Sequence, residues 1–283
     1  MAEPPGNAGA RRTLAPPGRR AARVTANEAI GAYRLIEALD RGGPSDPVPG
    51  QFYMLATARR WGAGADERPY LPRAFSFARA RRAERGVELS FLLEAIGPGT
   101  DRLAELEPGE DLLLTGPLGV GFVRPGPGEP LLVGGGIGVA PIVAWHDVLG
   151  GRAAVLLGFR SAAHAEAASL FDGAPAVATD DGSVGRAALV TELLRARLDA
   201  APEEETPTVY ACGPPPMLEA VRAICAERDV PAQLALESGM ACGYGACFGC
   251  VVPTRAGYVR LCLDGPVLDA AALETAAAPG TGH

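Results

Sequence analysis

The chain has 283 residues, of which 48% are hydrophobic and 21% are charged, an ordinary composition for a globular protein with room for two domains. Its formal charge of −7 at pH 7 argues against non-specific nucleic-acid binding, and its longest apolar stretch, residues 131–145, is too short and too glycine-rich to span a membrane. The sequence has no lysine and only three histidines, none in a metal-binding or triad-like pattern. These counts exclude a phosphate-loop or Schiff-base lysine and argue against histidine-based hydrolysis.

Residues 1–21 are rich in proline, glycine, alanine and arginine, and we expect a disordered tail there. A transit peptide is the alternative, but the segment lacks serine and has no obvious cleavage context. Because no secretory signal is recognisable, we expect a cytoplasmic protein.

Between residues 22 and 128, short strand-like runs alternate with turn residues. The runs occupy residues 31–39, 50–56, 87–94 and 111–116. Strands at this spacing, interrupted by glycine and proline, predict a small antiparallel β-barrel.

Two short motifs in this region suggest an anion site. Arg73 can bind a phosphate through two parallel hydrogen bonds, and Ser76 adds a hydroxyl. Taken alone, this pair is better explained as solvated strand residues. Gly99 and Thr100 precede a short helical run, so Thr100 is a candidate N-cap, a role compatible with phosphate binding at that helix end.

After a Pro/Gly-rich linker at residues 124–130 the pattern changes to alternating strands and helices. Strands are expected at residues 131–134, 153–159, 174–179 and 208–213, and helices from residue 141, at 187–198 and at 216–228. This alternation predicts a mostly parallel sheet with helices on both faces.

A glycine-rich run, residues 134–142, directly follows the first of these strands and opens a helix near Pro141. Glycines there let the backbone approach a pyrophosphate, and the helix N-terminus offers free N–H groups. A tight turn without a ligand is the alternative, but the strand–turn–helix context favours a dinucleotide. The loops at 179–183 and 211–217 also follow strands, where open α/β sheets bind ligands, although the first is equally well a plain Asp/Gly turn.

The most specific signal is a group of four cysteines near the C-terminus. Cys242, Cys247, Cys250 and Cys262 are spaced C-x4-C-x2-C-x11-C, and the first three match the spacing of a plant-type [2Fe–2S] site. Glycines between them suit a loop that wraps tightly around a cluster and turns its N–H groups toward sulfur.

Three other interpretations of the cysteines are weaker. A structural zinc site normally pairs cysteines as two C-x2-C knuckles, and only Cys247 and Cys250 form such a pair. A disulfide framework suits small secreted domains rather than a chain of this size without a signal peptide. Packing alone does not explain why four cysteines fall within twenty-one residues. In contrast, Cys225 lies in an apolar helical stretch and is expected to be a small buried hydrophobic residue.

In this order the motifs resemble the ferredoxin–NADP reductase superfamily, and more closely the electron-transfer subunits of NAD-linked (class B) dihydroorotate dehydrogenase. The matching runs are residues 49–52, 73–76, 97–100, 116–119, 134–141, 212–217, 237–250 and 262–267. The last two are the most specific. The resemblance implies an antiparallel FAD-binding β-barrel, a parallel α/β nucleotide domain and a [2Fe–2S] segment. We place the tail at 1–21, the barrel at 22–128, the nucleotide domain at 129–236 and the cluster segment at 237–283.

The resemblance also implies which residues hold each cofactor. For FAD they are Arg73, Ala74, Phe75, Ser76, Leu92, Leu93, Glu94, Gly99 and Thr100, with Arg73 and Thr100 on the pyrophosphate and Phe75 and Ser76 near the flavin. For NAD they are Gly135, Gly136, Gly138, Cys212, Gly213 and Pro214, and for the cluster Cys242, Cys247, Cys250 and Cys262. The family's arginine motif usually continues with proline; here Ala74 should soften the loop without removing the charge.

The implied activity is that of an NAD-dependent flavin/iron–sulfur oxidoreductase subunit in pyrimidine biosynthesis. Electrons would pass from the FMN of a catalytic dihydroorotate dehydrogenase subunit through the cluster and FAD to NAD⁺, in a heterotetramer with two copies of each subunit. No residue is predicted to be a proton-transfer catalyst, and the chain alone should be inert on dihydroorotate.

Two alternatives remain open at this point. The same reductase architecture can serve an oxygenase, a hydrogenase or a ferredoxin, and a zinc-binding nucleotide regulator without redox function belongs to a different class. Arg160 and Ser161, after the second strand of the nucleotide domain, can accommodate a 2′-phosphate, so the residues leave the choice between NAD and NADP undecided.

Overall fold

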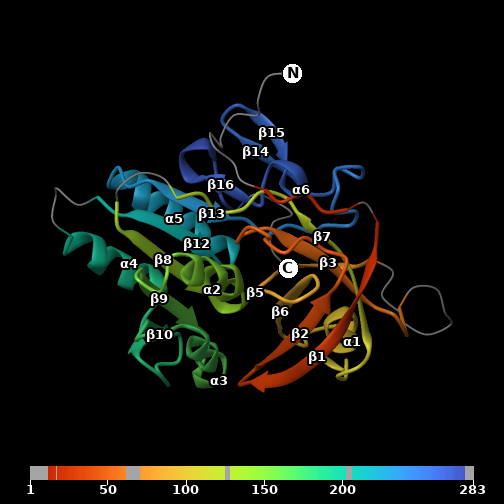
Figure 1. Cartoon of the computed structure of the whole chain (residues 1–283). Helices are drawn as coiled ribbons and strands as arrows, with labels where there is room; N and C mark the ends of the chain where they lie inside the picture. Colours follow the sequence, from red (N-terminus) through yellow and green to blue (C-terminus); the bar gives the residue numbers. More distant parts are fainter. Residues whose placement is uncertain (1–11, 17, 62–70, 125–127, 202–205, 278–283) are drawn as a thin grey trace.

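The computed structural model describes residues 12–16, 18–61, 71–124, 128–201 and 206–277. Residues 1–11 and 17 of the predicted disordered tail lie outside the described residues. In the rest of that segment, the hydroxyl of Thr13 donates to the carbonyl of Asp46 at 2.6 Å. Arg20 and Ala21 pair with Leu114 and Leu113, so they belong to the first sheet and not to a tail. Two seven-stranded sheets make up the body of the molecule, and a small two-stranded sheet lies beside them. In Figure 1 the N-terminal strands occupy one side, the strands and helices of the middle of the chain the other, and the C-terminal segment the top.

The first sheet is built only of antiparallel pairs, in the order β4-β3-β7-β1-β2-β6-β5. Its elements are β1 (Arg20–Ile30), β2 (Tyr33–Asp40), β3 (Phe52–Thr57), β4 (Arg73–Ser76), β5 (Arg79–Arg82), β6 (Val87–Leu93) and β7 (Asp111–Leu118), with α1 (Pro98–Ala104) between β6 and β7. The sheet curls around an apolar core in which Tyr53 meets Phe77 and Phe91 edge-on. The predicted antiparallel barrel is confirmed.

The second sheet has the order β11-β10-β9-β8-β12-β13-β16 and is parallel except at β16. Its strands are β8 (Pro130–Gly135), β9 (Ala154–Phe159), β10 (Ala176–Thr179), β11 (Arg186–Ala187), β12 (Thr208–Cys212), β13 (Ala232–Ala235) and β16 (Val267–Asp269). Its helical elements are η1 (Gly136–Gly138), α2 (Val139–Val148), α3 (Ala162–Ala165), η2 (Glu166–Leu170), α4 (Val190–Asp199) and α5 (Pro215–Glu227).

Alternating side chains of this sheet supply two apolar faces, as expected for a buried parallel sheet. On one face, Leu131 and Val133 of β8 belong to the same core as Leu194 of α4 and Leu218 of α5. On the other, Leu132 belongs to the core that contains α2 and α3. The predicted sheet with helices on both faces is therefore confirmed.

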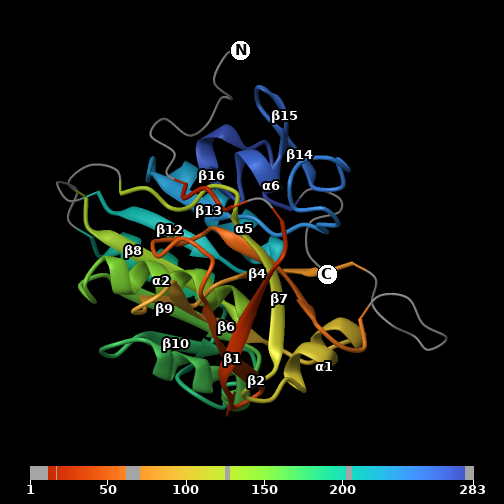
Figure 2. The same cartoon turned by 45° about the vertical axis from the view of Figure 1, so that its right-hand side comes forward.

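The C-terminal segment folds against both larger sheets. It contains β14 (Val251–Thr254), β15 (Gly257–Arg260), α6 (Leu261–Asp264) and η3 (Ala270–Ala272), and its strand β16 pairs with the edge strand β13. Its buried Cys250 and Cys262 share one core with Phe52 and Met54 of β3. Both views show this segment above the junction of the two sheets (Figures 1 and 2). No helix in the described ranges is long and apolar enough to cross a membrane.

Candidate functional site

The four candidate cluster ligands lie in two pairs. The side chain of Cys247 donates a hydrogen bond to that of Cys242, and the side chain of Cys262 donates one to that of Cys250. All four are free thiols; Cys247 is exposed, Cys242 is half-buried, and the second pair is buried. In the described part of the chain, no three His, Cys, Asp or Glu side chains converge on the position of one metal ion. Two pairs match a two-iron group with two thiolates per iron better than a tetrahedral zinc site.

A local feature of the backbone brings the two cysteines of each pair together. Strands β14 and β15 form a hairpin in which Val251 pairs with Arg260, and the N–H of Leu261 donates to the carbonyl of Cys250 at 3.0 Å. This hairpin brings Cys250 beside Cys262, although eleven residues separate them in the sequence.

The first pair depends on a turn with left-handed backbone. Gly243 and Gly245 have φ values of +80° and +83°, a conformation that costs glycine little and other residues more. A Cβ atom on Gly243 would lie 2.7 Å from Cγ of Met54, so this loop packs directly onto β3. The carbonyl of Gly245 accepts a hydrogen bond of 3.0 Å from Nη1 of Arg260. The loop therefore wraps as the sequence predicted for a cluster.

The acidity of the thiols differs between the pairs. Burial acts to raise the pKa of Cys242, but hydrogen bonds from the backbone of Cys247, Tyr244 and Ala246 and from the Cys247 side chain lower this pKa to about 6. Burial, followed by the neighbouring Cys250, raises the pKa of Cys262 to about 12. Bound metal replaces the protons of its thiol ligands. N–H groups directed at sulfur supply the hydrogen bonds to metal ligands that orient those ligands and tune an iron–sulfur group.

The predicted FAD motif forms strand β4 beside β3. Arg73 donates from Nη1 to the carbonyl of Leu71 at 2.6 Å, and its guanidinium stacks over the ring of Trp61, 5.9 Å from the centroid. A Cβ atom on Gly99 would lie 2.6 Å from Nε of Arg73, so the structure brings Arg73 against the first turn of α1. In this position of the guanidinium, glycine at position 99 leaves the space that it fills, which suits its proposed place on a pyrophosphate.

The remaining predicted FAD contacts lie on both faces of the first sheet. Phe75 packs against the barrel core, whereas Ala74 packs on the opposite side, against the core shared with the cluster segment. Ser76 is half-buried, and its hydroxyl makes no side-chain hydrogen bond with any described residue. Leu92 and Leu93 are fully buried, each in a different core, and their contact with FAD remains a prediction.

Thr100 does not cap α1 as the sequence predicted. The helix begins at Pro98, its N-cap is Gly97, and Thr100 is the third helical residue. Its hydroxyl instead accepts hydrogen bonds from the N–H groups of Ile96 and Gly97, at 3.0 and 3.1 Å. The N-cap prediction was wrong because Pro98 suits the first helical position and moves the start of the helix back. The role of Thr100 on the pyrophosphate remains a prediction.

The six predicted NAD residues come together where β8 and β12 end side by side. A Cβ atom on Gly138 would lie 2.6 Å from the carbonyl group of Cys212 and from Cα of Gly213, and one on Gly135 would lie 3.2 Å from Cδ of Pro214. Gly136, with φ of +53°, has open space beside it. The two glycine-containing loops thus form one surface at the carboxyl edge of the sheet, where such sheets bind nucleotides.

Glu237 joins this surface from the end of β13. Its half-buried carboxylate forms no hydrogen bond or ion pair with any described residue, and burial raises its pKa to about 7. Burial, and then the charge of Glu237, raise the pKa of the neighbouring Cys212 thiol. The sequence identified Glu237 only as part of a matching run. A carboxylate directly after a buried strand was the available signal.

A second set of contacts that the sequence did not indicate connects the barrel to the nucleotide domain. Glu94, after β6, forms an ion pair of 2.6 Å with Arg160, after β9, and His164 of α3 lies beside both. The sequence placed Glu94 in the FAD set and Arg160 in the nucleotide domain, with no sign of their contact.

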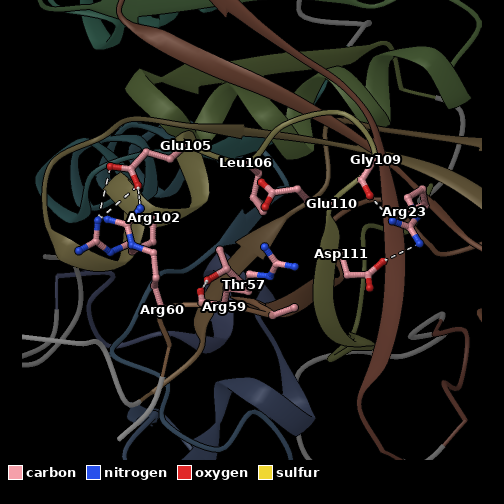
Figure 3. A pocket seen from close by; sticks show the side chains of 11 residues that line it. Arg23, Thr57, Arg59, Arg60, Arg102, Glu105, Leu106, Gly109, Glu110 and Asp111 are labelled. Atoms are coloured by element: carbon pink, nitrogen blue, oxygen red, sulfur yellow. Dashed lines mark hydrogen bonds and ion pairs between the residues drawn. The ribbon is translucent and has the colours of Figure 1, made fainter. Parts of the chain in front are cut away.

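A cavity of about 370 Å³ lies elsewhere, near the C-terminal end of α1 (Figure 3). Three of the arginines in Figure 3 form ion pairs: Arg60 and Arg102 share Glu105, at 2.6 and 3.3 Å, and Arg23 lies 3.4 Å from Asp111. None of the predicted cofactor residues lines it. We assign it no role.

Comparisons with known proteins agree with this arrangement. A family model described as the iron–sulfur cluster binding domain of dihydroorotate dehydrogenase B matches residues 237–274. The chain is 34% identical over 251 residues to the dihydroorotate dehydrogenase B (NAD(+)) electron transfer subunit of Caldanaerobacter subterraneus subsp. tengcongensis, covering 87% of this chain and 94% of that protein. It is 39% identical to the protein of the same name from Geobacillus kaustophilus, over 78% and 85% of the two chains.

Solved structures show the same fold. An NADH-dependent reduced ferredoxin-NADP oxidoreductase superposes with a TM-score of 0.75 at 22% identity, covering 91% of both chains. A ferredoxin NADP⁺ reductase from Neisseria gonorrhoeae with bound FAD and NADP gives a TM-score of 0.57 at 18% identity, over 74% of this chain and 91% of that one. Because identity to curated relatives exceeds one third over nearly their whole length, the chain belongs to the family of electron transfer subunits of dihydroorotate dehydrogenase B (NAD(+)).

Proposed function

We propose that this chain passes electrons from the FMN of a dihydroorotate dehydrogenase catalytic subunit, through a [2Fe–2S] cluster and FAD, to NAD⁺ in pyrimidine biosynthesis. Residues 22–128 would hold FAD, 129–236 NAD(H) and 237–283 the cluster. We further propose a heterotetramer of two catalytic and two electron-transfer subunits. A cytoplasmic location suits four thiols that must stay reduced to bind iron.

One observation carries the proposal. The loop that holds Cys242 and Cys247 packs through Gly243 on Met54 of β3, and Met54 is paired across the ladder with Ala74 of the FAD motif. The candidate iron ligands and the candidate flavin contacts are thus separated by a single strand. Electron tunnelling requires this kind of proximity, and a shared apolar core holds the two sites together.

The chain's residues position the reacting groups rather than transfer protons. Arg73, held by Leu71 and Trp61, supplies a fixed positive charge for the flavin pyrophosphate. Ser76 lies on the face toward the cluster segment and offers a hydroxyl that makes no side-chain hydrogen bond with any described residue. The turns at 135–138 and 212–214 offer backbone N–H groups to a dinucleotide. A flavin, when bound, exchanges electron pairs with a nicotinamide and single electrons with an iron–sulfur cluster.

The test is reconstitution under anaerobic conditions. The purified chain should contain FAD, iron and sulfide, oxidise NADH with an artificial acceptor, and leave dihydroorotate unchanged. Addition of the FMN-containing catalytic subunit should produce dihydroorotate-dependent NAD⁺ reduction and a complex whose mass fits two of each subunit. Dihydroorotate oxidation by the isolated chain would contradict the proposal. A colourless protein that contains zinc would also contradict it. So would a chain that delivers electrons to a ferredoxin, oxygenase or hydrogenase and accepts none from the catalytic subunit.

We place the catalytic subunit on an aromatic surface formed by Tyr244, Phe248 and Tyr258. These are the only large aromatic side chains that the described residues leave strongly exposed, and Tyr258 is 79% exposed. Phe248 lies under the guanidinium of Arg260, 5.0 Å from its ring, and the exposed Cys247 precedes it. Exposed aromatic and arginine side chains are typical anchors of protein interfaces.

We expect Tyr258→Ser to weaken binding of the catalytic subunit by roughly 10- to 100-fold, because an anchor residue loses its contact. Calorimetric titration of the cluster-loaded chain with the catalytic subunit measures the change. NADH oxidation with an artificial acceptor should persist, since Tyr258 lies outside the nucleotide and flavin positions. Val148→Ser, at a side chain 61% exposed on α2, is the control and should bind normally. Equal affinity of the Tyr258 variant and the control would place the partner elsewhere.

A further inference from the structure

The carboxyl end of β9 is the position at which a parallel nucleotide-binding sheet distinguishes NAD from NADP. There an acidic side chain binds the ribose 2′-hydroxyl of NAD, or an arginine accommodates the 2′-phosphate of NADP. In this chain β9 ends at Phe159 and is followed by Arg160 and Ser161, so its own residues favour a phosphate. The acidic group comes from the other domain.

Glu94 reaches this position from the end of β6. Its Oε1 lies 2.6 Å from Nη2 of Arg160, across 66 residues of sequence. The same Nη2 lies 2.8 Å from Nε2 of His164. A guanidinium can only donate, so Nε2 of the imidazole accepts, and its Nδ1–H is then the donor to Oγ of Ser161, at 2.9 Å. Nη2 of Arg160, which suits a 2′-phosphate, is therefore committed to Glu94 and His164, whereas Ser161 accepts from the imidazole and keeps its own hydroxyl proton.

The arrangement is held from the barrel side as well. The ring of His164 meets Tyr33 edge-on, with centroids 5.5 Å apart, and Tyr33 is buried. The N–H of Ala32 donates to the carbonyl of Ala163 at 2.9 Å, which joins the β1–β2 turn to α3. Although Arg160 is 66% exposed, Glu94 and His164 are 24% and 15% exposed and fixed by these contacts. This ion pair is better ordered than a pair of two mobile surface side chains.

We infer that Glu94 is a specificity-determining residue that makes the nucleotide site select NAD(H) over NADP(H). Its carboxylate neutralises Arg160 and sets a negative charge beside the ribose 2′ position. A 2′-phosphate must either break the ion pair or approach a like charge, whereas a 2′-hydroxyl meets neither obstacle. The inference rests on the proposed NAD(H) site, and it assigns the Glu94 side chain a role distinct from the FAD contact that the family resemblance implies.

Two small probes isolate this effect from electron transfer. Adenosine 5′-monophosphate and adenosine 2′,5′-bisphosphate differ only in the 2′-phosphate, and calorimetry on the FAD- and cluster-loaded protein gives a dissociation constant for each. In Glu94→Gln we expect affinity for the bisphosphate to rise roughly 5- to 20-fold relative to the monophosphate, since one repulsive charge is lost and Arg160 is released. The ratio of kcat/KM for NADPH to that for NADH, with an artificial acceptor, should rise in parallel. Both values of each ratio are measured on the same protein sample. A loss of FAD in the variant therefore lowers both values and leaves their ratio unchanged.

A double variant tests the mechanism. Glu94→Gln combined with Arg160→Gln should lose the gain, because the released guanidinium is what binds the 2′-phosphate. Glu129→Gln, which breaks the surface ion pair of Glu129 with Arg197 at 3.1 Å, is the matched control for removal of one negative charge and should leave the ratio unchanged.

The outcomes separate this inference from the proposed function. An unchanged ratio in Glu94→Gln, or a gain that survives removal of Arg160, would overturn the inference while the proposed function stands. Loaded wild-type protein that binds neither adenosine nucleotide and does not oxidise NADH would overturn both.

Discussion

Cys250→Ala is expected to abolish assembly of the iron–sulfur group and to reduce electron transfer from the catalytic subunit to NAD⁺ at least about 100-fold, more than the roughly 10- to 100-fold loss typical when a hydrogen-bond partner of a metal ligand is removed. Cys250 is buried, interacts with Cys262 and accepts the N–H of Leu261 at its carbonyl. Its removal would leave one iron with a single thiolate from this pair. The two described cysteines outside the predicted ligand set, Cys212 and Cys225, lie in β12 and α5.

Three measurements check this result. Iron and acid-labile sulfide should fall toward zero, the brown absorption should disappear, and dihydroorotate-dependent NAD⁺ reduction with the catalytic subunit should be lost. NADH oxidation with a two-electron acceptor should survive, because it requires only the flavin and nucleotide sites. The control is Cys225→Ala, a buried cysteine of α5 whose pKa burial raises to about 12 and which is expected to bind no metal. Unchanged iron content and electron throughput in Cys250→Ala would contradict the cluster assignment.

Arg73→Gln is expected to weaken FAD binding by about 10- to 150-fold, which corresponds to the loss of a hydrogen bond to a charged group. The guanidinium is preorganised by Leu71 and Trp61 and lies against Gly99, so little side-chain entropy is lost when it binds phosphate oxygens. Glutamine keeps part of the length and hydrogen bonding but not the charge.

Titration of the apoprotein with FAD, followed by quenching of flavin fluorescence, gives the affinity directly. Arg73→Lys should recover only part of it, since a lysine retains the charge without the planar fork. Arg81→Gln is the control: Arg81 lies on β5, the next strand along the chain but at the opposite end of the strand order, is exposed, and lies 3.9 Å from the carboxylate of Glu37. Equal FAD affinity in the Arg73 and Arg81 variants would remove Arg73 from the pyrophosphate.

The predictions that the sequence supported best depend on residues that lie close to one another in the chain. The cysteine spacing identified four candidate ligands, and the interleaved glycines predicted the left-handed turns found at Gly243 and Gly245. The same expectation was wrong at Gly249, where the neighbouring Phe248 has positive φ instead. The glycine-rich run after a buried strand predicted the turn between β8 and α2. In each case neighbouring residues suffice, because glycine conformation, helix starts and ligand spacing are settled within about a dozen residues. Thr100 shows the limit of this local information, since one proline two positions earlier moved the helix start.

The tertiary structure alone decided how these pieces meet. Sheet order and register put Met54 beside Ala74 and under the cysteine loop, and the β14–β15 hairpin matched Cys250 with Cys262. The approach of Glu94 to Arg160 depends on how the curled sheet docks against α3. Contacts between residues so far apart in the chain are set by packing of whole elements, and no local pattern encodes them. The sequence by itself therefore determined which chemical groups this protein carries, and the fold determined which of them act on one another.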